Sequence, residues 1–160
     1  MNWLTAPAPA WTTSTGLLVI RVAIGAAFIL HGIPKIQDPT GWMNAMGNPP
    51  PAFLQAAAAV IEVGGGALLV LGLLGRVAAS LLVAQMIAAL ALVHIPHGDP
   101  FVGTPGRSSA ELAVAYLAVS LLLAVTGPGQ WSLDAMLFGM RSEAAKEKRI
   151  PGPAPAFTSP

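Results

Sequence analysis

Residues 17–35 read LLVIRVAIGAAFILHGIPK, an almost wholly apolar run that carries Arg21, His31 and Lys35. At a rise of about 1.5 Å per residue, a helix over this stretch spans about 28 Å, close to the hydrocarbon thickness of a bilayer. The stretch therefore predicts a first transmembrane helix. Five of its residues fall on one narrow stripe, with His31 on the flank: Arg21, Gly25, Phe28, Gly32 and Lys35. We expect this stripe to face other helices, while the opposite face meets lipid.

Composition places the rest of the chain in a membrane as well. Charged residues make up 9% of the chain and hydrophobic residues 54%, whereas an ordinary soluble domain has about 25% charged residues. Three further apolar runs follow, at residues 52–74, 77–95 and 109–126. The predicted fold is all-α, an integral membrane four-helix bundle with antiparallel helices. We expect the third helix to stop at Pro96, and a short interfacial helix to follow the fourth span from Ser132 through Met140.

The remaining segments divide the chain into three parts. Residues 1–15 contain no Lys or Arg and predict a flexible lead-in, residues 16–140 form the transmembrane domain, and the charged, proline-rich residues 141–160 predict a disordered tail. Basic residues are more frequent on the side of the two termini, so the positive-inside rule places both termini in the cytoplasm. A net charge of +1 argues against nucleic-acid binding, and the absence of cysteine removes thiol chemistry from this chain.

Arg21 is costly to place against hydrocarbon, so we expect it to find a carboxylate partner between helices. Glu62 is the single ionisable residue of the run at 52–74 and lies near its middle. Small residues three and four positions from Glu62 allow a second helix to approach closely. We therefore predict an Arg21–Glu62 ion pair. Lys35, at the end of the first helix, is expected to extend outward to the lipid head groups.

Helical rise places four ionisable side chains, one from each helix, in the outer half of the membrane: His31, Glu62, His94 and Glu111. Two imidazoles and two carboxylates inside a bundle could ligate a transition metal, relay protons or hold the polar head of a quinone. No helix offers the Glu-x-x-His spacing of di-iron bundles, so we assign no metal ligands.

Structural interpretations of the same residues stay open. The Arg21–Glu62 pair could serve only to lock two helices together. Glu111 completes a capping-box pattern with Ser108 at the start of the fourth helix. The two histidines could hydrogen-bond to neighbouring loops.

An ordered set of short motifs resembles the DoxX family over roughly residues 17–138. The motifs are R-x-x-x-G-x-x-x-x-x-H-G-x-x-K at 21–35, G-N-P at 47–49, I-E-x-x-G-G at 61–66, L-G-L-L-G-R at 71–76, Glu111, and G-P-G-x-W-S-L-D at 127–134. The resemblance implies a small four-helix protein of the prokaryotic cytoplasmic (inner) membrane. The family takes its name from a subunit of an archaeal thiosulfate:quinone oxidoreductase, and some relatives are linked to membrane assemblies that manage oxidative or thiol stress. Its recurring polar positions correspond here to Arg21, His31, Lys35, Glu62, Glu111 and Asp134.

The first functional hypothesis is a membrane subunit of a redox assembly, which contacts the lipid bilayer and other redox subunits. In this hypothesis Glu62 and His31 carry the chemistry by binding a quinone or handling protons, and a polar cluster supports them: Arg21, Lys35, His94, Glu111 and Asp134. The alternative is a non-enzymatic membrane scaffold or small carrier in which the cluster is structural.

Overall fold

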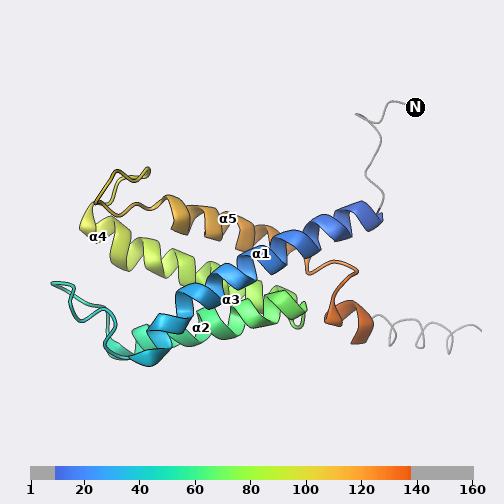
Figure 1. Cartoon of the computed structure of the whole chain (residues 1–160), viewed down its shortest axis with the longest axis horizontal. Helices are drawn as coiled ribbons and strands as arrows, with labels where there is room; N and C mark the ends of the chain where they lie inside the picture. The colour runs from blue at the N-terminus through green and yellow to red at the C-terminus, as the bar shows by residue number, and fades with distance from the viewer. Residues whose placement is uncertain (1–9, 138–160) are drawn as a thin grey trace, which may run out of the picture.

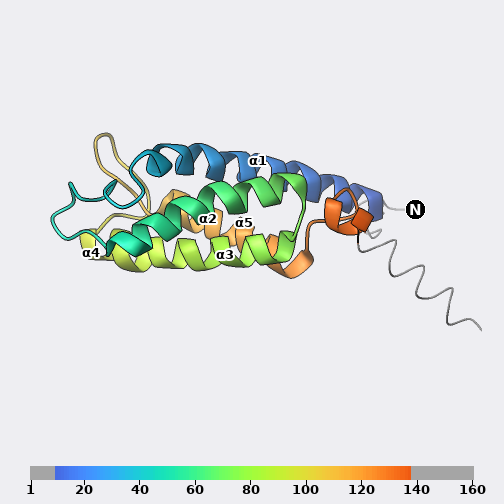
Figure 2. The ribbon, with the colours of Figure 1, turned by 90° about the horizontal axis from the view of Figure 1, so that it is seen from below.

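The computed structural model describes residues 10–137 of the chain. Its elements are, in chain order, α1 (Ala10–Gln37), α2 (Ala52–Leu71), α3 (Gly75–Ala89), the π-helical segment η1 (Leu90–His94), α4 (Ile95–His97) and α5 (Glu111–Thr126). Figures 1 and 2 show the long helices running side by side. The connections at residues 38–51 and 98–110 lie together at one end, which we call the loop end. The start of α1, the α2–α3 turn and residues 127–137 lie at the other, the termini end.

The chain is an all-α membrane protein, as its composition predicts. Within residues 10–137, three helices are long and apolar enough to cross a membrane: Trp11–Gln37, Ala52–Leu71 and Gly75–His97. The fourth apolar helix, α5, is shorter, with 16 residues. Large apolar side chains are exposed along the outside of all four, among them Leu30, Val60, Leu81 and Val125. An exposed apolar surface of this kind is what a bundle presents to lipid.

Two helix limits differ from the sequence-based expectations. Helix α1 begins at Ala10, so residues 10–15 of the expected lead-in are helical. Pro96 does not end the third helix, because the wider π-helical turn of η1 precedes it and helical structure continues to His97. In that turn Ile95 donates its backbone N–H to the carbonyl of Leu90, five residues back. A local widening of this type accommodates the proline ring and its missing N–H.

The expected short helix after the fourth span is described only in part. Residues 133–137 are helical, and Ala135 donates its backbone N–H to Ser132 Oγ at 3.1 Å, as predicted for a Ser132 cap. Met140, the expected end of this helix, lies outside the described residues, as do residues 1–9 of the expected lead-in and the tail at 141–160.

Helices α1 and α2 touch through their backbones. A Cβ atom on Gly25 would lie 2.7 Å from the carbonyl oxygen of Gly66, and a Cβ atom on Gly66 would lie 2.6 Å from the carbonyl oxygen of Gly25. Two turns further along α1, Gly32 also packs closely on α2, against Glu62 and Val63. Only glycine permits this approach, so these residues fix how the two helices are aligned. The core beside them is formed by Phe28, Leu69, Ala78, Ala79, Leu82, Met86, Ala113 and Leu123.

The glycine contact predicts a position-specific cost. We expect Gly66→Ala to lower the free energy of unfolding by about 1–3 kcal/mol, because its methyl group meets a backbone atom that cannot move aside. The measurement is unfolding in mixed micelles followed by circular dichroism. Gly64→Ala is the matched control, since a Cβ at Gly64 meets nothing within 4 Å. Equal stability of the two variants would refute the contact.

Candidate functional site

Arg21 and Glu62 do not form the predicted ion pair. The Arg21 side chain is buried at the termini end, with 2% of its surface exposed. Its Nη1 donates to the backbone carbonyls of Leu69 at 2.9 Å and Val70 at 3.0 Å, and its Nη2 donates to the carbonyl of Trp131. Arg21 therefore satisfies carbonyls at the C-terminus of α2, where the helix leaves such groups without partners and a positive charge is favourable.

Asp134 lies near Arg21 at the same end and has a capping role. Its two carboxylate oxygens each accept a backbone N–H at 2.8 Å, one from Leu74 and one from Gly75. These are the first amides of α3, so Asp134 caps that helix from a position far along the chain. The arrangement joins α1, α2, α3 and residues 127–137 through structural hydrogen bonds.

The partner of Glu62 is Lys35. Lys35 Nζ lies 2.6 Å from both carboxylate oxygens of Glu62, and the exposed fractions of the two side chains are 20% and 4%. The expectation that Lys35 extends outward to head groups is therefore wrong. The alignment set by Gly32, which packs on Glu62, brings the end of α1 beside the middle of α2. A buried carboxylate is strongly favoured to pair with the cation that this alignment supplies.

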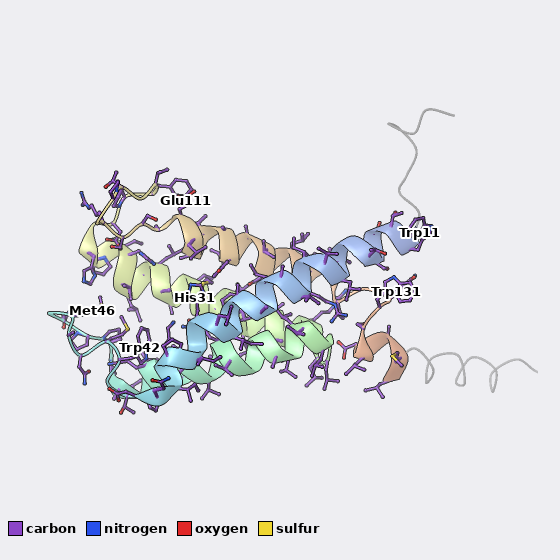
Figure 3. All side chains as sticks on the ribbon, viewed as in Figure 1. Trp11, His31, Trp42, Met46, Glu111 and Trp131 are labelled. Carbon is purple, nitrogen blue, oxygen red and sulfur yellow. The ribbon has the colours of Figure 1, made fainter. Side chains whose placement is uncertain are left out.

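The connection at residues 38–51 folds over this ion pair. Lys35 Nζ lies 4.5 Å from the ring centroid of Trp42, close enough for a cation–π contact. Trp42 Nε1 donates to the carbonyl of Gln55 at 3.2 Å, and the backbone N–H of Met43 donates to Gln55 Oε1 at 3.0 Å. Figure 3 shows Trp42 at the loop end and Trp131 near the termini end. The Lys35–Glu62 pair beside Trp42 and the Arg21 side chain beside Trp131 therefore lie far apart.

Lys35 and Glu62 form part of the walls of two cavities. The first, which we call the tryptophan cavity, has a volume of about 230 Å³ and is also lined by Trp42, Gln55 and Gln85. The second, the histidine cavity, has a volume of about 200 Å³ and is also lined by His31, His94 and Tyr116. The ion pair therefore lies between two mostly apolar cavities, one with two amide side chains in its wall and the other with two imidazoles.

Three of the four residues predicted to converge do share the histidine cavity: His31, Glu62 and His94. The ring of His31 packs edge-on against Tyr116 with centroids 5.7 Å apart, and its Nδ1 bonds to the carbonyl of Ala27 at 2.8 Å. His94 Nδ1 lies 2.8 Å from Asp99 Oδ2 in the loop that follows. The loop interaction considered for His94 is therefore present, while His31 bonds to its own helix.

Glu111 is not part of this cluster. It is exposed at the start of α5 and does not line the histidine cavity. The capping-box interpretation is also wrong, because the N-terminus of α5 has no side-chain cap. Ser108, the expected capping partner, instead donates its hydroxyl to Asp99 Oδ1 at 2.6 Å. That bond, followed in strength by the bond with His94, lowers the pKa of Asp99.

Sequence reasoning missed Trp42, Tyr116 and Asp99. Tyr116 is the only tyrosine of the chain, a polar group in an otherwise apolar run, which was a usable signal. Asp99 follows Gly98, whose φ of 63° reverses the chain beside His94. Within residues 10–137, no group of three or more metal-ligating His, Asp or Glu side chains is close enough to hold an ion.

Comparison with known proteins gives consistent matches. The DoxX family matches residues 16–95. "Uncharacterized membrane protein Rv3486" of Mycobacterium tuberculosis is 33% identical over 131 residues, which cover 76% of this chain and 80% of that protein. "Putative oxidoreductase CatD" of Bacillus subtilis is 33% identical over 77% of this chain and 87% of its own. "Inner membrane protein YphA" of Escherichia coli is 33% identical over 74% of this chain and 87% of its own. No solved structure matches.

The ion pair predicts an asymmetric response to substitution. We expect Lys35→Leu to lower the free energy of unfolding by about 3 kcal/mol, because it leaves the buried Glu62 carboxylate uncompensated. Glu62→Leu should cost less, since the longer lysine side chain can then reach water. The double variant should recover most of the stability. Unfolding in mixed micelles measures all three, and strictly additive effects would show that the two side chains do not interact.

Proposed function

The chain belongs to the DoxX family, and we propose that it is a subunit of a membrane redox assembly that binds a quinone head group at the Lys35–Glu62 pair. One relative is named "Putative oxidoreductase CatD", and two others are named as inner membrane proteins. We carry both statements to this chain as part of the proposal. The partners of the proposal are the lipid bilayer and the other redox subunits of the assembly.

The observation that carries the proposal is the position of the ion pair between two cavities. A buried Lys–Glu pair is costly to desolvate. A well-packed apolar pair would stabilise the bundle at least as well. Ionisable groups at this depth are usually functional. The two cavities, of about 230 and 200 Å³, suit a single substituted ring rather than a whole drug-sized ligand. An isoprenoid tail would then extend toward lipid.

The donor set of these walls fits a quinone ring. A quinone carries two carbonyl oxygens, which accept hydrogen bonds, and its reduction takes up two protons with two electrons that the other subunits would supply. Lys35 is a donor, and the hydroxyl of Tyr116 is a donor in the histidine cavity. Glu62 holds Lys35 in place and keeps its charge tolerable away from water. The residues of this chain thus bind and orient the ring and hold protons beside it.

We extend the proposal to topology. The four apolar helices form an antiparallel bundle of four spans in the cytoplasmic (inner) membrane of a prokaryote, with α5 as the shortest span. Both termini face the cytoplasm. Arg76, in the first turn of α3, lies at the termini end and supports this orientation by the positive-inside rule.

A second function is favoured by one observation. Lys35 Nζ reaches both oxygens of Glu62 at 2.6 Å, so the pair satisfies itself without a ligand. In a membrane scaffold or small carrier, the ion pair would serve only to hold α1 and α2 together. The two functions differ in whether Glu62 affects ligand binding.

Decylubiquinone binding to the purified full-length protein in lipid nanodiscs tests the proposal. Quenching of Trp42 fluorescence is the readout, since Trp42 lines the tryptophan cavity, and Trp42→Phe identifies its share of the signal. We expect saturable binding that Glu62→Gln weakens at least tenfold, equivalent to about 1.4 kcal/mol. Without its carboxylate partner, Lys35 turns away to water and no longer orients the ring.

Glu111→Gln is the matched control, because it makes the same chemical change at an exposed glutamate outside both cavities. Its affinity should equal that of the wild type. Circular dichroism confirms that both variants are folded. Absent wild-type binding, or equal affinity in Glu62→Gln, would favour the scaffold.

A further inference from the structure

We propose that Asp99 and His94 form a dyad that exchanges a proton between water at the loop end and a ligand oxygen in the histidine cavity. In this dyad His94 is the proton-carrying group and Asp99 is a positioning residue. The inference rests on the proposed function, because it concerns the ligand of the same site. It assigns a role to Asp99 that the sequence did not suggest.

The geometry of the dyad is fixed from several directions. His94 Nδ1 lies 2.8 Å from Asp99 Oδ2, and Ser108 Oγ donates to the other oxygen, Asp99 Oδ1, at 2.6 Å. The backbone N–H of Asp99 donates to the carbonyl of His94 at 3.0 Å. Asp99 therefore holds the His94 ring and is itself held by Ser108. An arrangement of this kind sets the orientation and tautomer of a histidine.

The tautomer follows from the chemistry of the contact. The Ser108 hydroxyl and then the His94 contact lower the pKa of Asp99, so its carboxylate is ionised at neutral pH and can only accept hydrogen bonds. His94 Nδ1 must then carry the proton. This leaves Nε2 as an acceptor in the neutral ring and as a donor once the ring gains a second proton, whose positive charge Asp99 stabilises.

The second nitrogen is available to a ligand. His94 lines the histidine cavity, and no side chain or backbone group within residues 10–137 has a described hydrogen bond to its Nε2. The other titratable groups on that cavity wall are His31 and Lys35 from α1, Glu62 from α2 and Tyr116 from α5. A fifth of the His94 side chain is exposed, 20% by area. A proton can therefore leave Nε2 for a ligand oxygen and be replaced from water, while the Nδ1 proton stays on His94 and remains hydrogen-bonded to Asp99.

The local backbone supports a functional position. His94 is the last residue of the π-helical segment η1, and single π-helical turns within α-helices often occur at functional sites. His97, three residues further, has no such arrangement: its Nδ1 bonds to the backbone carbonyl of Val93 at 2.8 Å, and it lines neither cavity. His97 is therefore a matched control within the same turn of chain.

The pH dependence of decylubiquinone binding in nanodiscs tests the dyad. In the wild type, affinity should be several-fold higher at low pH than at high pH, because Nε2 donates to the ring oxygen only when the imidazole carries both protons. We expect His94→Gln and Asp99→Asn to flatten this profile and His97→Gln to keep it. A purely structural role would change affinity equally at every pH.

The outcomes separate the two proposals. Wild-type pH dependence in either His94→Gln or Asp99→Asn overturns the dyad and leaves the quinone site standing. Absence of binding to the wild type overturns the proposed function, and the dyad with it. Nitrogen-15 NMR of the wild-type protein is a further check, and its result does not depend on whether a variant folds. The His94 signal, assigned by its loss in His94→Gln, should show the Nδ1–H tautomer at neutral pH, and an Nε2–H tautomer overturns the dyad.

Discussion

The backbone contact between Gly25 of α1 and Gly66 of α2 is the constraint on which the other interactions depend. With no side chain between them, the two backbones approach closely at these glycines, and this contact favours the observed alignment of the helices. That alignment puts Arg21 opposite the last turn of α2 and Lys35 beside Glu62. Two basic residues of one helical stripe, about 21 Å apart along the axis, thus reach opposite ends of the molecule.

The two ends use charge differently. At the termini end, backbone carbonyls surround Arg21 and backbone amides surround Asp134, so each charge completes the hydrogen bonding of a helix terminus. At the loop end, Lys35 and Glu62 have each other and face two cavities. Backbone groups cannot be exchanged for a ligand without unfolding a helix end. The side chains of the Lys35–Glu62 pair can change partners without unfolding a helix, and this favours the loop end as the place of the proposed ligand site.

Helical periodicity and composition were sufficient to predict an all-α membrane protein and the meeting of His31, Glu62 and His94. They did not determine the partner of Glu62, because a periodic stripe shows which residues face a neighbour but not how far the neighbour slides along it. The glycines that set this alignment were visible only as small residues. Asp99 was missed for a related reason. It joins His94 through the reversal at Gly98, a loop geometry that apolar periodicity does not encode.

The most direct test of this account is a side-chain distance in the bilayer. Solid-state NMR dephasing between lysine Nζ or arginine Nη nitrogens and glutamate carboxyl carbons reports which cation lies beside Glu62, with Glu62→Gln identifying its signal. We predict strong dephasing from Lys35, whose Nζ lies 2.6 Å from both oxygens, and none from Arg21. Strong dephasing from Arg21 would contradict it.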